Sequence, residues 1–131
     1  MNQKPILAEI SVGELVDKIT ILMIKDKHLN GDKQAIVQKE LNILQGALAS
    51  QVEVDEYIKA QFDALLSVNQ TLWDIEDAIR LCERDQCFDE TFIDLARRVY
   101  ITNDKRAELK RNINTHTGSN IAEVKSYEPY E

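Results

Sequence analysis

Apolar residues recur along this chain at the three- and four-residue spacing of α-helices, in four segments separated by short polar links. The run Ser11-Val12-Gly13-Glu14 has the form of a capping box, and the pattern after it predicts a helix over about residues 11–30. Gly31 is expected to end that helix in the left-handed conformation. Further stripes predict helices over about residues 32–49, 55–84 and 89–115, the last capped by Asp89 and ended by Gly118.

Few turn-forming residues accompany these stripes, since the 131 residues include four Gly and two Pro. So few turn formers leave little room for the many short connections of a β-sandwich or barrel. The apolar residues of 119–131 fall at every third position, which predicts an extended tail. The chain is therefore expected to be one all-α domain over residues 1–131, an antiparallel bundle of four helices with an extended C-terminal tail.

Acidic residues outnumber basic ones by 23 to 16, which gives a net charge of −7. This balance argues against nucleic acid or an anionic membrane as the main partner. The longest near-apolar run covers residues 19–24, whereas a membrane span needs about 20 residues. No signal peptide is recognisable, and two cysteines are too few for a disulfide framework. We therefore expect a cytoplasmic protein with free thiols.

Polar residues interrupt the apolar stripes of the two long helices. In the 89–115 helix the stripe that begins at residues 88, 92, 95 and 99 continues through Asn103, Arg106 and Lys110. In the 55–84 helix, Asn69 and Glu76 break the stripe in the same way. An antiparallel hairpin turning near residue 87 would set Asn69 opposite Arg106 and Glu76 close to Asn103.

Charges on a buried face must be paired, line a wet cavity or meet a ligand, because isolated buried charges are costly. Two interpretations stay open. The first is a buried ion-pair network in which Arg106 and Lys110 pair with Glu76 and its neighbours. The second is a pocket for an anionic small molecule, in which Arg106 and Lys110 bind the charge and Asn69 and Asn103 bind hydroxyl groups.

The first helix has two apolar faces. Ile21 and Ile24 lie opposite the main stripe, in line with Glu14, Asp17 and His28. Either this helix is central in the bundle, or its second face meets another subunit. We favour a homodimer through Ile21 and Ile24, because the three polar residues would be awkward inside a monomer.

Other motifs carry little chemistry. The spacing Cys82-x4-Cys87 is not that of a zinc site, no Gly-rich phosphate loop is present, and no residue is placed as a nucleophile. We therefore expect no metal and no cofactor. The acidic residues between 74 and 85 nevertheless resemble the Mg²⁺-binding carboxylates of all-helical nucleotide pyrophosphohydrolases, so a metal-dependent hydrolase or an isomerase using Glu76 stays an alternative.

Several strings of residues between Glu9 and Tyr130 carry a wider resemblance. They are 9–18 (EISVGELVDK), 72–80 (LWDIEDAIR), 103–107 (NDKRA), and the closing Gly118-Ser119 and Lys125-Ser126-Tyr127. In these strings the chain resembles a family of small bacterial and phage proteins of unknown function, often encoded beside lipopolysaccharide and capsule glycosyltransferases. The resemblance implies a surface-polysaccharide context, in which a phosphorylated or nucleotide-linked sugar is the expected ligand. A non-catalytic partner of a glycosyltransferase is the alternative that it implies.

Overall fold

The computed structural model describes residues 2–121 and 123–131, and all regular structure in these residues is helical. The helices are α1 (Val12–His28), α2 (Gly31–Gln51), α3 (Glu56–Arg84) and α4 (Glu90–Thr117). For the described residues, the prediction of an all-helical fold with four helices is confirmed. No helix within the described part of the chain is both long enough and apolar enough to cross a membrane.

Local capping bonds explain where the helices begin and end. The Ser11 hydroxyl accepts from the Glu14 N–H at 3.0 Å, and the Asp89 carboxylate accepts from two N–H groups of the first turn of α4. Gly118 ends α4 with a φ of 65°. Gly31 was expected to end the first helix in the left-handed conformation. It has a positive φ of 60°, but α1 already ends at His28, and Gly31 is the first residue of α2.

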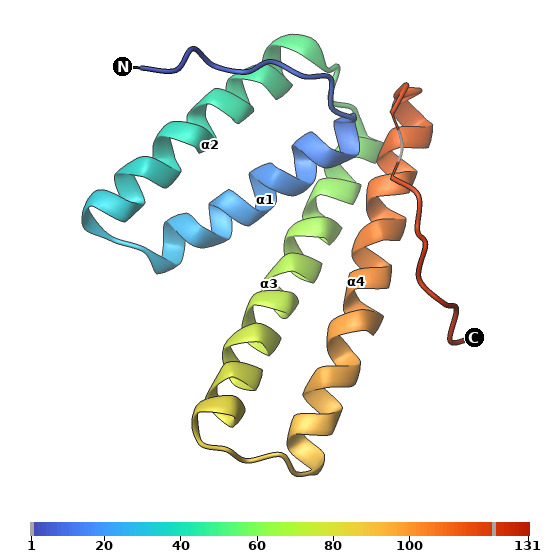
Figure 1. Ribbon diagram of the computed structural model, residues 1–131. Helices are drawn as coiled ribbons and strands as arrows, with labels where there is room; N and C mark the ends of the chain where they lie inside the picture. The colour runs from blue at the N-terminus through green and yellow to red at the C-terminus, as the bar shows by residue number, and fades with distance from the viewer. Residues whose placement is uncertain (1, 122) are drawn as a thin grey trace.

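The helices form two hairpins, α1 with α2 and α3 with α4, and α1 packs the first hairpin onto the second (Figure 1). The chain reverses between α1 and α2 and again between α3 and α4, and the two hairpins diverge from their common end. α1 packs closely against each of the other three helices. The half of α3 and α4 that lies farthest from α1 extends beyond it, so the two helices pack there against one another (Figure 1).

Both apolar faces of α1 are used inside the chain. Its main face packs through Leu15, Ile19 and Leu22 on Val37 and Leu41 of α2. Val16, which lies beside this face, packs in a cluster with residues 58, 65 and 113 of α3 and α4. Burial of each such aliphatic side chain contributes about 1.5–3 kcal/mol.

This arrangement corrects the prediction about Ile21 and Ile24. Ile24 is 2% exposed and Ile21 is half-buried, and both line a groove together with residues of α3. The second face of α1 is therefore covered by α3 and α4 of the same chain, as expected for a central helix. Burial of Ile24 within one chain removes the reason to place another subunit on this face.

A close approach of α1 and α4 sets the position of the site described below. The Gly13 N–H donates to Asn114 Oδ1 at 2.7 Å, and the Val12 N–H donates to Ser119 Oγ at 3.1 Å. A Cβ atom on Gly13 would lie 2.5 Å from the Lys110 carbonyl oxygen. The absence of a side chain at residue 13 thus lets the first turn of α1 rest on the backbone of α4.

Residues 119–121 and 123–131 run beside α4 (Figure 1). Glu123 forms an ion pair with Lys110, and Lys125 forms one with Asp104. The rings of Tyr130 and Tyr100 lie with their centroids 5.4 Å apart. The tail therefore contributes charged groups to the surface of α4.

Candidate functional site

A buried carboxylate of α1 lies where the polar residues of α3 and α4 meet. The side chain of Asp17 is 1% exposed. Arg106 of α4 binds it side-on, with Nε donating to Oδ1 at 2.9 Å and Nη2 donating to Oδ2 at 2.5 Å. Paired charge-assisted bonds of this kind fix both groups in orientation. The hydrogen bonds to Asp17 also raise the pKa of Arg106 above its ordinary value.

Two further polar residues complete the surroundings of Asp17. Asn69 of α3 is 5% exposed, and its Nδ2 donates to both Asp17 Oδ1 and Thr20 Oγ1 at 2.9 Å. The Thr20 hydroxyl in turn donates to the backbone carbonyl of Asp17 at 2.7 Å. Asn69 and Arg106 thus meet at one carboxylate oxygen, which joins α1, α3 and α4.

Lys110 extends this network toward the tail. Its Nζ lies 2.9 Å from a carboxylate oxygen of Glu14, 2.8 Å from one of Glu123 and 4.0 Å from Asp17 Oδ2. Burial alone would lower the pKa of Lys110, but hydrogen bonds to Glu123 and Glu14 outweigh it and raise the pKa. Two cations are therefore balanced by three carboxylates. We call Asp17, Asn69, Arg106, Lys110 and Glu14 the Asp17 network.

One of the two interpretations left open paired the two cations with Glu76, and that pairing is wrong. Glu76 pairs with Arg80 on its own helix at 3.2 Å, and its side chain is 44% exposed. The partner carboxylates come instead from α1 and the tail. The expectation that Asp17 would be awkward inside a monomer is also wrong, because Arg106 and Asn69 donate hydrogen bonds to its oxygens there.

Sequence reasoning missed Asp17 as the centre of the network, although a signal was present. Asp17 precedes Ile21 and Ile24 by four and seven residues on one face of α1. Asp17 is an acidic residue in an apolar stripe of α1, just as Arg106 is a basic residue in the apolar stripe of α4. If both faces of α1 are taken as internal, these two opposite charges are the natural ion pair.

A groove of about 460 Å³ runs between α1, α3 and α4 beside the network. Four of the five predicted site residues line it: Asn69, Glu76, Asn103 and Arg106. Lys110 does not, and lines a second hollow of about 420 Å³ together with Glu123 and Lys125 of the tail. Asn103 and Arg106 lie on the walls of both. We refer to the first hollow as the α1/α3/α4 groove.

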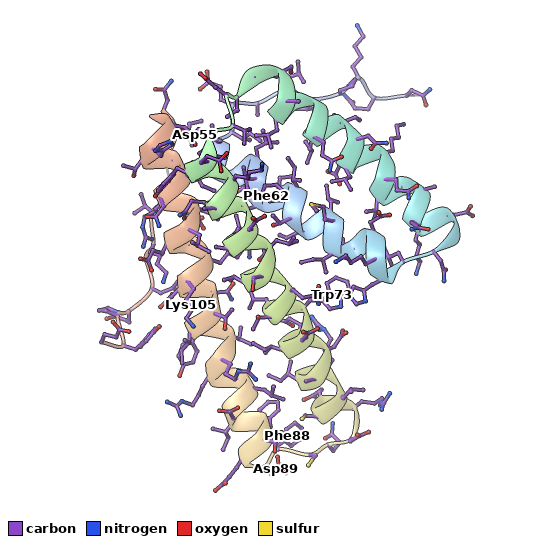
Figure 2. All side chains as sticks on the ribbon, turned by 180° about the vertical axis from the view of Figure 1, so that it is seen from behind. Asp55, Phe62, Trp73, Phe88, Asp89 and Lys105 are labelled. Atoms are coloured by element: carbon purple, nitrogen blue, oxygen red, sulfur yellow. The ribbon has the colours of Figure 1, made fainter. Side chains whose placement is uncertain are left out.

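Trp73 forms part of the groove wall and lies between α3 and the end of α1 (Figure 2). His28 stacks on its ring with centroids 4.7 Å apart and an interplanar angle of 17°. The indole Nε1 is buried and has no hydrogen-bond partner among the residues that the structure describes. A buried N–H group without a partner is uncommon in folded proteins.

Within residues 2–121 and 123–131, no three side chains of His, Cys, Asp or Glu lie together in a way that could hold a metal ion. The groove is instead lined by amide, carboxylate, guanidinium, ammonium and indole groups. Such groups are suited to bind hydroxyl groups and an anion.

A family model matches residues 6–130, and its description is a family of unknown function, DUF6165. The chain belongs to the DUF6165 family. No curated protein and no solved structure matches the chain. The DUF6165 match covers all four helices, the Asp17 network and both hollows.

Proposed function

We propose that this protein binds an anionic sugar, phosphorylated or nucleotide-linked, in the α1/α3/α4 groove. The geometry of Arg106 carries the proposal. Asp17 takes up its Nε and one N–H of Nη2, so the outer edge of the guanidinium has no partner among the described residues. Its side chain is 29% exposed and lies on the groove wall. A guanidinium held on one edge is ready to bind an oxyanion with the other.

Neighbouring groups suit the hydroxyl groups of a sugar. Asn103 is exposed on the groove wall, and the Glu76 carboxylate is accessible beside it. Trp73 lines the same groove and offers an aromatic ring on its wall. A few convergent polar groups in a partly apolar groove are typical of small-molecule sites.

The charges along the groove favour a weakly charged ligand. Its wall carries three cations, Lys25, Arg80 and Arg106, and two carboxylates, Glu76 and Asp77. Asp17 lies directly behind Arg106 and offsets part of its charge. We therefore expect specificity to depend on hydroxyl contacts as much as on the phosphate, and inorganic phosphate alone to bind weakly.

The biological setting of the proposal rests on the resemblance to proteins encoded beside lipopolysaccharide and capsule glycosyltransferases. In this setting the protein would act in the cytoplasm, holding or presenting an activated sugar during synthesis of a surface polysaccharide. The polysaccharide setting and the groups that line the groove favour the same class of ligand, an anionic sugar.

Thermal unfolding in the presence of candidate ligands tests the proposal. The unchanged protein should melt at a higher temperature with sugar phosphates or nucleotide sugars at constant ionic strength, since a ligand at one hundred times its Kd stabilises by about 2.7 kcal/mol. Asn103→Ala and Lys25→Ala remove groove groups that have no structural hydrogen bond to another described residue, and should reduce the shift. Arg98→Ala removes an exposed cation of α4 outside both hollows and is the matched control.

Equal shifts in all four proteins, or no shift with any sugar, would refute the groove as the binding site. A rise that needs Mg²⁺ and disappears with EDTA would favour the metal-dependent hydrolase instead.

A further inference from the structure

The turn between α3 and α4 contains a feature that is independent of the groove. α3 ends in a Schellman motif, in which Gln86 has a φ of 54°. The Gln86 N–H donates to the Glu83 carbonyl at 3.1 Å, and the Cys87 N–H donates to the Cys82 carbonyl at 2.9 Å. Both hydrogen bonds of the motif are therefore formed around a non-glycine residue in the left-handed conformation.

The motif brings the two cysteines together. The two residues joined by its longer hydrogen bond commonly contact one another through their side chains, and here they are Cys82 and Cys87. A direct bond between their backbones is compatible with the Cα separation of about 4.4–6.8 Å that a disulfide needs. Both cysteines are free, Cys87 is exposed and Cys82 is partly exposed. A small molecule can thus reach the pair.

The surroundings of Cys87 agree with this placement. Its thiol donates to Asp89 Oδ2 at 3.5 Å, which raises the pKa of Cys87, and the nearby Cys82 adds to the shift. Asp89 at the same time caps α4 through the N–H groups of Thr91 and Phe92. Figure 2 shows Asp89 at the far end of the hairpin from Asp55.

We propose that Cys82 and Cys87 form a redox-modifiable dithiol that exchanges with small-molecule disulfides to give a disulfide across the α3–α4 turn. In the first step one cysteine thiolate attacks a sulfur of the disulfide RSSR, forms a mixed disulfide and releases RS⁻. In the second, the other cysteine loses its proton to solvent and attacks the cysteine sulfur of the mixed disulfide, releasing the second RS⁻. Two protein thiols are oxidised, and one RSSR is reduced to two thiols.

The disulfide would close a ring over residues 82–87 and make the turn rigid. Asp89 would lose the hydrogen bond from Cys87 and keep its two backbone bonds to α4. The modification therefore leaves the helices in place and changes the chemistry of an exposed turn, reversibly.

Equilibration with mixtures of oxidised and reduced glutathione tests the proposal. After the remaining thiols are alkylated, mass spectrometry should show a main oxidised product that has lost two hydrogen atoms and carries no glutathione. The effective concentration for ring closure should be at least about tenfold higher in the native protein than in denaturant, because the fold holds the two thiols together. Cys82→Ser and Cys87→Ser should each give only the mixed disulfide.

Two substitutions at residue 86 separate the motif from mere closeness in sequence. Gln86→Gly keeps the left-handed conformation and should oxidise as readily as the unchanged protein. Gln86→Pro removes the N–H and requires a negative φ, so ring closure should fall toward the value in denaturant. If Gln86→Pro loses helicity, the test rests on the unchanged protein alone, through the ratio of its effective concentrations for ring closure in the native and denatured states. A ratio near one, or glutathione accumulating on both cysteines of the native protein, would overturn the proposal.

Discussion

Replacing Arg106 by Met removes the cation that holds the buried Asp17, and should lower the free energy of unfolding by about 3–5 kcal/mol. Two charge-assisted hydrogen bonds are lost. Such bonds contribute about 1.5–3 kcal/mol each, which gives a loss of the same size. Asp17 would keep the hydrogen bond from Asn69. The Lys110 ammonium, 4.0 Å away, is too distant for a hydrogen bond but still offsets part of the carboxylate charge. A value near the lower end is therefore expected.

The partner substitution shows how much of this loss is pairwise. Asp17→Asn alone should cost less, about 1–2 kcal/mol, because Arg106 is partly exposed and can turn toward water. In the double variant Asp17→Asn with Arg106→Met no charge is left unpaired, and a coupling of about 2–3 kcal/mol should be recovered. Lys105→Met, on an exposed position of the same helix (Figure 2), is the control and should stay within about 0.5 kcal/mol.

Urea unfolding at neutral pH, followed by far-ultraviolet circular dichroism, measures all four variants. The slope of the free energy against urea should stay constant, so that shifts of the midpoint report stability. Additive losses in the double variant, or a loss below about 1 kcal/mol for Arg106→Met, would show that Asp17 and Arg106 are not the centre of the fold's polar network.

Three further predictions follow from other contacts. Gly13→Ala should destabilise the protein by about 1–3 kcal/mol, because its Cβ would meet the Lys110 carbonyl and Asn114. Gly46→Ala has open space around it and should stabilise the protein by about 0.5–1 kcal/mol. Equal effects of the two substitutions in urea unfolding would contradict the close crossing of α1 and α4. Hydrogen bonds from the Ile58 N–H and His116 lower the pKa of Asp55 from its ordinary value. The ionised carboxylate therefore stabilises the fold above the ordinary pKa of Asp, and this stabilisation is lost as the pH falls through the lowered pKa. Melting temperatures of Asp55→Asn should lack this loss in acid. Ile24→Ala should cost about 2–5 kcal/mol at every protein concentration, since the side chain is buried within one chain; a loss that varies with concentration would restore the dimer interface.

The helix ends could be predicted from the sequence because capping is local. Ser11, Asp89 and Gly118 act on backbone groups within a few residues of themselves. Gly31 shows the limit of such reasoning, since a left-handed glycine fits the turn before α2 as well as the end of α1. α1 ends at His28, three residues before Gly31, and a link of two residues leads into α2.

Partners across the chain could not be read from periodicity. Asp17 and Arg106 are 89 positions apart, and nothing local says that the second face of α1 lies on α4. Glu76 was expected as the partner because it shares a hairpin with Arg106. Glu76 lines the groove beside α1, but its half-exposed carboxylate pairs with Arg80 of its own helix. α1 covers only part of the α3–α4 hairpin (Figure 1), and Phe88, which the stripe of α4 placed in the core, is 50% exposed at the far end.

If the α1/α3/α4 groove binds an anionic sugar, Trp73 on its wall should report the binding directly. It is the single tryptophan of the chain, so its indole N–H gives one assignable signal in a ¹⁵N–¹H correlation spectrum. Titration with a sugar phosphate or nucleotide sugar should move this signal in a saturable way, with a weaker response in Asn103→Ala and an unchanged one in Arg98→Ala. A Trp73 signal that stays in place while ligand is added to millimolar concentration, or that moves equally with inorganic phosphate, would contradict sugar binding in this groove.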